Sequence, residues 1–179
     1  MTMALHSTLT ATRFRVDETN VNARPWTAEQ VFLRLGPAVH GYLRTQLPSD
    51  ADDLLSEVFL HVTRGLGRFR GDDAALRRWV FTIAHHKVVD ERRRLARRAQ
   101  AAAALPERGI APPHEAADRD LVDALHALTP DQREVVVLRF MGDLSLEAVA
   151  RITRRRVGAV KALQHRALEN LAASLAPAP

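Results

Sequence analysis

The stretch that decides the fold is residues 128–166, LTPDQREVVVLRFMGDLSLEAVARITRRRVGAVKALQHR. Thr129 and Gln132 flank a proline at the first position of a helix, so the threonine hydroxyl and the glutamine side chain can each satisfy a free backbone amide there. Ser145 can cap a second, short helix. A turn over residues 153–156 separates this short helix from a last one. The stretch therefore predicts a helix-turn-helix.

The last helix, expected over residues 157–174, has two different faces. Its inner face is expected to consist of Val157, Val160, Leu163, Ala167 and Leu171. Its outer face is expected to carry Lys161, Ala162, His165 and Arg166. A basic outer face at this place in a helix-turn-helix suits the major groove of DNA. The alternative is a helical pair whose basic exterior is merely solvated.

Three consecutive arginines, Arg154, Arg155 and Arg156, precede the last helix. Positive charge at the amino end of a helix is unfavourable because it meets the positive end of the helix dipole. A phosphate backbone at that end would offset the repulsion and would also accept hydrogen bonds from the helix amides. The triplet therefore favours phosphate contact, and a solvated basic turn is the alternative.

The first half of the chain shows only helical periodicity. Apolar residues recur every four positions from Thr27 to Pro48, and the same pattern returns after Asp50 and again over residues 73–98. The outer face of the second of these helices presents the carboxylates of Asp52, Asp53 and Glu57. With 5% aromatic residues and short β-branched runs, the chain is predicted to be all-α.

Packing residues follow from the same periodicity. The third helix is expected to pack through Leu76, Trp79, Val80 and Ile83 and to be almost wholly polar beyond them. A loop is expected between Gly65 and Gly71. In the second half, the apolar faces are expected to consist of Leu121, Val122, Leu125, Leu128, Val135, Val136, Leu138 and Phe140.

Two helical domains joined by a flexible linker are the expected organisation. Residues 99–117 combine an alanine run with prolines and a glycine, which is typical of a linker. Fully extended, these nineteen residues could reach roughly 60 Å, so the domains can act some distance apart. The domains are predicted over 25–98 and 118–176, after a disordered tail over 1–24.

Charge and composition narrow the function. The net charge is +5, but residues 64–98 carry eleven Lys and Arg against four acids (+7), and residues 150–179 carry six against one (+5). Two basic blocks separated by acidic segments indicate two contacts with a polyanion, unless both are solvated helix faces. No cysteine is present, which excludes disulfides and thiolate chemistry. No stretch is long and apolar enough for membrane insertion.

No catalytic motif, cofactor or metal site is expected. Adjacent His85 and His86 point about 100° apart on a helix, which does not suit a shared metal ion even with Asp90 nearby. The phosphate-binding glycine motifs and the nucleophile-elbow motif are absent. The chain is therefore not expected to be an enzyme.

Aromatic and basic residues alternate in the first basic block. Phe69, Trp79 and Phe81 lie near arginines, an arrangement that suits unpaired bases stacking on rings while their phosphates meet the guanidinium groups. The alternative for Trp79 is a place in the hydrophobic core, because it has helical spacing from Leu76 and Ile83.

These residues stand in a recognisable order. Residues 52–59 (DDLLSEVF), 69–71 (FRG) and 78–90 (RWVFTIAHHKVVD) resemble sigma region 2. Residues 128–135 (LTPDQREV), 138–140 (LRF), 144–150 (LSLEAVA) and 157–161 (VGAVK) resemble sigma region 4. Together they are similar to a bacterial extracytoplasmic-function sigma factor, the two-domain class of RNA polymerase initiation subunit.

The resemblance implies roles for particular residues. Binding to the beta-prime clamp helices of core RNA polymerase is implied for Asp52, Asp53 and Glu57. Melting and reading of the minus-ten promoter element is implied for Arg68, Phe69, Arg70, His86, Lys87, Arg92, Arg93 and Arg94. Contact with the minus-thirty-five element is implied for Arg154, Arg155, Arg156, Lys161, Ala162, His165 and Arg166. The implied partners are core polymerase (clamp helices and beta flap), promoter DNA and an anti-sigma factor. The protein is expected to act in the cytoplasm.

Three positions depart from the family pattern. His86 stands where many members have asparagine, and Arg154 and Arg156 stand where a turn glycine and a capping serine or threonine are common. Two other classes of protein are alternatives to a sigma factor. A response regulator would explain only residues 118–175, because its receiver needs strands in the first half. A helical adaptor would show no salt-dependent DNA binding.

Overall fold

The computed structural model describes residues 26–101 and 116–175, and every regular element within these two ranges is a helix. The expected tail over 1–24 and residues 102–115 of the expected linker over 99–117 lie outside the described residues. The two ends of that linker, residues 99–101 and 116–117, are helical. The all-α class is confirmed. No helix in the described ranges is long and apolar enough to cross a membrane.

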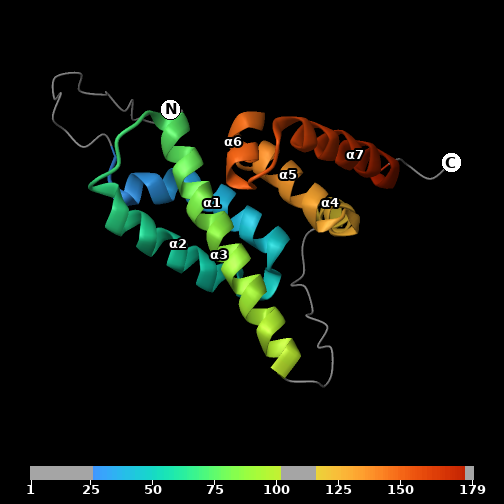
Figure 1. Ribbon diagram of the computed structural model, residues 1–179, viewed down its shortest axis with the longest axis horizontal. Coiled ribbons are helices and arrows are strands. Elements are labelled where there is room, and N and C mark those ends of the chain that lie inside the picture. Colours follow the sequence, from blue (N-terminus) through green and yellow to red (C-terminus); the bar gives the residue numbers. More distant parts are fainter. Residues whose placement is uncertain (1–25, 102–115, 176–179) are drawn as a thin grey trace, which may run out of the picture.

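The first unit consists of α1 (Ala28–Gln46), a short 3-10 turn η1 (Pro48–Asp50), α2 (Ala51–Leu66) and α3 (Asp73–Ala101). Thr27 begins α1 with a capping box, because its hydroxyl accepts from the amide of Gln30 while the Gln30 side chain accepts from the amide of Thr27. All three helices pack against one another. In Figure 1 the last part of α3 extends beyond α1 and α2, and the side chains of residues 93–101 are exposed.

The second unit consists of α4 (Ala116–Ala127), α5 (Pro130–Phe140), α6 (Leu146–Ile152) and α7 (Val157–Leu175). Both predicted caps are confirmed. The Thr129 hydroxyl accepts from the amide of Gln132 at 3.3 Å, and the Ser145 hydroxyl accepts from the amide of Ala148 at 3.1 Å. The turn between α6 and α7 lies at residues 153–156, as the sequence predicts.

Several packing expectations were wrong. Gly65 lies inside α2 and not in a loop. A glycine is needed at this helical position because the indole of Trp79 packs directly against it and leaves no room for a side chain. Phe140 is 58% exposed and Leu121 is 46% exposed. The buried face of α5 is instead a broad band over residues 134–138, because α7 covers one side of the helix and α1 covers another.

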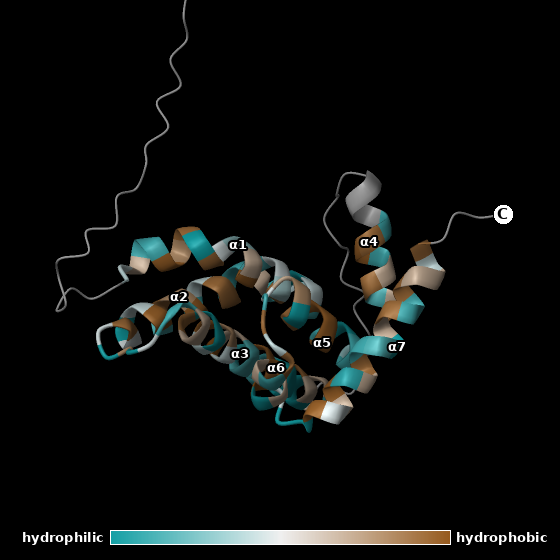
Figure 2. Cartoon of the chain, turned by 90° about the horizontal axis from the view of Figure 1, so that it is seen from above, coloured by the Kyte–Doolittle hydropathy of each residue, from teal (hydrophilic) through white to brown (hydrophobic). Residues whose placement is uncertain are grey.

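The two units are in contact in this structure, although the linker predicted between them is long enough to let them separate. Here α5 packs on α1 and α6 packs on α3, so the buried side chains of both units form one continuous core. Figures 1 and 2, which view the molecule from directions 90° apart, both show α6 beside α3. The sequence analysis expected α3 to be almost wholly polar beyond Ile83. In the structure this part of α3 also has a buried face, which consists of Ala84, His85, Val88 and Glu91.

Candidate nucleic-acid interface

The outer face of α7 presents all four side chains that the sequence analysis assigned to it. Lys161, Ala162, His165 and Arg166 are exposed, whereas Val160 and Ala167 on the opposite face are fully buried. His165 lies 3.3 Å from Glu169, and the Arg166 Nε donates to the carbonyl of Ala162 at 3.3 Å. These groups are free to reach a ligand because both contacts are exposed, local contacts along the helix.

The turn before α7 is held by its backbone. The amide of Arg155 donates to the carbonyl of Ala150 at 2.9 Å, and Arg154 adopts a φ of +55°, the left-handed conformation that glycine prefers. The departure from a turn glycine at this position therefore leaves the turn geometry in place at a cost in strain.

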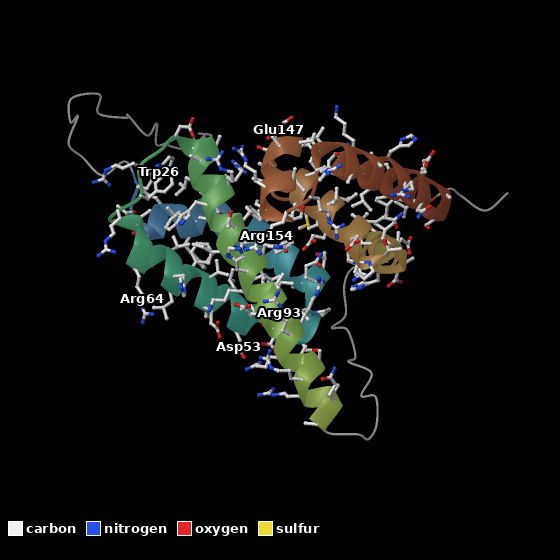
Figure 3. All side chains as sticks on the ribbon, viewed as in Figure 1. Trp26, Asp53, Arg64, Arg93, Glu147 and Arg154 are labelled. Carbon is white, nitrogen blue, oxygen red and sulfur yellow. The ribbon has the colours of Figure 1, made fainter. Side chains whose placement is uncertain are left out.

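The three arginines of the turn are not equivalent. Arg154 and Arg156 are exposed, but an Nη atom of Arg155 lies 2.7 Å from a carboxylate oxygen of Asp131 at the start of α5. Arg155 therefore ties the turn to α5. Arg154, labelled in Figure 3, and Arg156 are left as the exposed cations of the triplet.

A carboxylate stabilises the start of α6. The pKa of Glu147 is lowered, first because its carboxylate accepts a hydrogen bond from its own backbone amide and second because the Ser145 hydroxyl hydrogen-bonds to it. Both groups satisfy the free amides at the first turn of the helix. This cap fixes the direction in which α6 leads into the turn.

The loop over residues 67–72 carries the first aromatic and basic cluster. Phe69 stacks on Trp79 with ring centroids 5.2 Å apart and an angle of 23° between the planes. The Arg70 side chain folds back and donates to the backbone carbonyls of Gly67 and Phe69, while Arg68 is exposed. Trp79 is only partly buried, so it supports the stacked Phe69 ring from the edge of the core.

The basic residues of α3 point in more than one direction. His86 and Arg93 are exposed, and Arg94 is paired with Glu91 at 2.7 Å. Arg92 is different, because it is partly buried and donates to the Gln46 side chain at 2.6 Å. The structure therefore brings His86, Arg93 and Arg94 to the surface and turns Arg92 toward α1.

The acidic face of α2 adjoins the basic residues of α3. Asp52 is 93% exposed at its side chain and lies 2.9 Å from His40, and Asp53, labelled in Figure 3, is exposed. Glu57 accepts a hydrogen bond from Lys87 at 2.7 Å. Glu57 and Lys87, for which the resemblance implies different partners, thus bind each other in this structure.

Sequence reasoning missed a buried polar group between the two units. The His85 Nδ1 lies 3.0 Å from a carboxylate oxygen of Glu134, and both residues are more than 90% buried. Tyr42 lies beside them, and burial, followed by the charge of Glu134, raises its pKa well above the usual value. The available signal was the pair of charged residues Arg133 and Glu134 directly before the apolar run over residues 135–138. In the described residues, no cluster of side chains fits a metal ion.

Comparisons with known proteins match both halves of the chain. The family model for Sigma-70 region 2 matches residues 31–98, and that for Sigma-70, region 4 matches residues 118–171. The ECF RNA polymerase sigma factor SigD of Mycobacterium tuberculosis (strain ATCC 25618 / H37Rv) is 35% identical over 156 residues, which cover 79% of this chain and 74% of SigD. CarQ of Myxococcus xanthus is 34% identical over 152 residues, covering 80% and 86%.

Other relatives differ in length or have solved structures with a similar fold. BldN of Streptomyces coelicolor is 32% identical over 141 residues, which cover 73% of this chain and 53% of BldN, so the chain spans about half of that relative. The sigma factor RpoE from Bartonella quintana, solved with the anti-sigma factor NepR, aligns with a TM-score of 0.71 at 25% identity over 82% of this chain and 95% of RpoE. CnrH, solved with the cytosolic domain of CnrY, aligns with a TM-score of 0.55 at 25% identity over 83% of this chain and 86% of CnrH.

The matches follow the order in which the structure arranges its elements. Region 2 corresponds to α1–α3, and region 4 corresponds to α4–α7 with the exposed face of α7. With both regions present in order, and relatives 34–35% identical across most of both sequences, the chain belongs to the extracytoplasmic-function group of the sigma-70 family of RNA polymerase sigma factors, which direct promoter-specific transcription initiation.

Proposed function

We propose that this chain binds core RNA polymerase and directs it to promoters by reading two DNA elements with two separate domains. The observation that carries the proposal is the face of α7, where Lys161, His165 and Arg166 are exposed opposite a fully buried apolar stripe. A helix presented in this way after a turn is the arrangement that enters the major groove. The acidic face of α2 supplies a second, separate surface for a protein partner.

The domain boundaries proposed are 25–98 for region 2 and 118–176 for region 4, joined by a linker over 99–117 and preceded by a tail over 1–24. Region 2 would dock on the beta-prime clamp helices through Asp52 and Asp53, and through Glu57 once Lys87 releases it. Exposure of the Asp52 and Asp53 side chains and their position on one helix face support this role.

The minus-ten element would be melted and read by the surface around the Phe69 loop and α3. The supporting observations are the exposed Arg68, the Phe69 ring held by Trp79, and the exposed His86, Arg93 and Arg94. Arg70, Lys87 and Arg92 belong to the same proposal, but each would first have to leave the intramolecular partner that holds it.

The minus-thirty-five element would be read by α7 and clamped by the turn before it. Lys161, Ala162, His165 and Arg166 would approach base edges, and Arg154 and Arg156 would reach phosphates. Arg155 would contribute less to DNA contact because Asp131 already holds it.

The remaining proposals concern chemistry and partners. The chain would act in the cytoplasm as a binding subunit of the polymerase, without catalysing a reaction itself and without a cofactor. An anti-sigma factor is a further proposed partner, supported by the solved RpoE, which has NepR bound.

A gel shift with and without core polymerase tests the function. We expect weak, salt-sensitive binding of promoter DNA by the isolated chain and a discrete, sequence-specific complex when core polymerase is added. A specific complex without polymerase would favour a conventional two-domain DNA-binding regulator. No DNA binding under either condition would favour a helical adaptor and would contradict the proposal.

A further inference from the structure

The strongest feature that the function leaves unused is the junction between the two units. Helix α5 packs on α1, and two of its polar residues, together with Met141 directly after it, contact region 2. Arg133 donates to the backbone carbonyl of Thr45 at 3.3 Å, Glu134 meets His85 of α3 at 3.0 Å, and the Met141 methyl group occupies the space beside Gly41. Just past α5, Asp143 lies 3.8 Å from Arg77. Contacts with region 2 are therefore made near the start of α5 and in the segment just after its end.

The pair at the centre of the junction makes the arrangement specific. Glu134 is 6% exposed and His85 is 9% exposed, and the two side chains meet across the junction of the two units. A buried carboxylate is tolerated only where a partner satisfies it, so a slipped or rotated docking of the two units would leave Glu134 unpaired. Tyr42, fully buried beside the pair, closes the site on the α1 side.

The junction also contains an element that opposes closure. Burial lowers the pKa of Arg133 first, and the charge of Arg92 lowers it further, so two guanidinium groups from opposite units lie close enough to repel. Arg92 is one of the residues proposed to reach promoter DNA. In the closed chain, Arg133 of the second unit lies near Arg92, whose hydrogen bond to Gln46 is made within the first unit.

We propose that Glu134 and His85 form a latch that holds the free chain closed, and that this closure is autoinhibitory. The latch itself rests on the contacts above; its inhibitory role rests on the proposed function. Two promoter elements named for positions about 25 base pairs apart are separated by about 85 Å of B-DNA. A compact body of this size measures about 40 Å across, so both elements are reached together only after the units separate.

Closure also restricts the helix-turn-helix. In this structure α6, the first helix of the motif, packs on α3 (Figure 2). The first helix of such a motif crosses the DNA backbone while the second enters the groove. In the closed chain, α3 occupies one side of α6, so opening would clear the approach to the backbone as well as extend the reach of the molecule.

Energy transfer between two dyes tests the latch without DNA or polymerase. The chain has no cysteine, so the replacements His61→Cys on α2 and Ala172→Cys on α7, both at exposed positions, place one dye on each unit. We expect efficient transfer in the parent chain. The change Glu134→Ala should lower the ratio of closed to open molecules by about tenfold or more, because it leaves His85 buried without its partner.

A matched control is available in α7. Glu169→Ala removes an exposed His–Glu contact and should leave the transfer unchanged. His85→Ala should open the chain like Glu134→Ala, and the double variant should open it less than the sum of the two single effects. Helix content, measured by circular dichroism, separates opening from unfolding. Inefficient transfer in the parent chain, or equal transfer in the parent and both single variants, would overturn the latch.

A covalent lock tests the inhibitory role. Arg77→Cys and Asp143→Cys, joined by a short bis-maleimide, should hold the chain closed and abolish most promoter-specific transcripts, whereas each single-cysteine chain treated identically should remain active. A locked chain as active as the controls would overturn the autoinhibitory role. If the controls also give no specific transcripts, the proposed function fails and autoinhibition fails with it, while the dye experiment still decides the latch.

Discussion

Arg154 carries the clearest strain at the scale of a single residue. Its φ of +55° is in the left-handed region that glycine adopts most easily, and an arginine there costs about 1–2 kcal/mol. The turn tolerates the cost because the next residue, Arg155, is held by its amide, which donates to Ala150, and by its ion pair with Asp131. A strained arginine in the turn between the two helices of a helix-turn-helix is consistent with a role in phosphate contact.

Replacing Arg154 with glycine should therefore stabilise the fold. We expect Arg154→Gly to raise the free energy of unfolding by about 1 kcal/mol, because the strain is larger than the chain entropy that glycine adds. Urea denaturation of the full chain measures the change. The control is Arg156→Gly, since Arg156 is also exposed but its φ is negative. An equal or opposite response of the two variants would contradict the strain at Arg154.

Two kinds of basic residue in region 4 should respond differently to salt and sequence. Lys161→Ala or Arg166→Ala should cost about 1–3 kcal/mol on a matched upstream element and relax preference at one or two positions, because base contacts are lost. Arg156→Ala should weaken binding on every sequence alike and reduce the salt slope by about one unit. Arg155→Ala should change the slope less, since Asp131 holds that side chain.

Holoenzyme affinity, measured across salt concentrations on matched and scrambled upstream elements, separates these effects. Equal losses for Lys161→Ala on both DNAs would mean that α7 does not read sequence at that position, and the recognition face would then lie elsewhere on the helix.

At the scale of elements, the acidic face of α2 and the basic face of α3 lie side by side. The Glu57–Lys87 contact joins them at 2.7 Å. Glu57 is therefore partly neutralised within the chain, whereas Asp52 and Asp53 point outward. We therefore propose that the first turn of α2 makes the larger part of the polymerase contact.

Charge reversal at that turn should weaken binding to core polymerase. We expect Asp52→Lys with Asp53→Lys to lower affinity by about tenfold, because each rim charge contributes under about 1 kcal/mol to association. Titration of labelled chain with core polymerase measures it. The matched control, Glu29→Lys with Asp123→Lys, makes the same change in net charge at exposed positions outside this turn. Unchanged affinity in the α2 variant, or an equal loss in the control, would contradict the assignment.

Element boundaries could be predicted because their signals are local. Thr129 with Gln132, and Ser145, start their helices as the sequence indicates, and α3 begins at Asp73 as expected. The outer face of α7 was likewise predictable from helical spacing. The burial of side chains between the two units could not be predicted, because periodicity shows which face of a helix is apolar but does not show which element covers that face. His85 looked like a polar helix end because its partner lies 49 residues away on α5.

At the scale of the whole molecule, the two units are held together by polar contacts around a shared core. The contacts of Glu134, Arg133 and Asp143 with region 2 all come from α5 or the segment just after it. These polar contacts at α5 add to the packing of α6 on α3, and together they set the relative position of the two reading surfaces. Release of these contacts would convert the compact chain into two units that the linker between Ala101 and Ala116 still connects.

Reconstituted run-off transcription tests the central claim most directly. Core polymerase is mixed with this chain and a library of genomic fragments, and the ends of the transcripts are mapped. We predict discrete start sites that are absent with core polymerase alone and that share two upstream elements. Transcripts without defined start sites, or the same sites with and without the chain, would contradict the account.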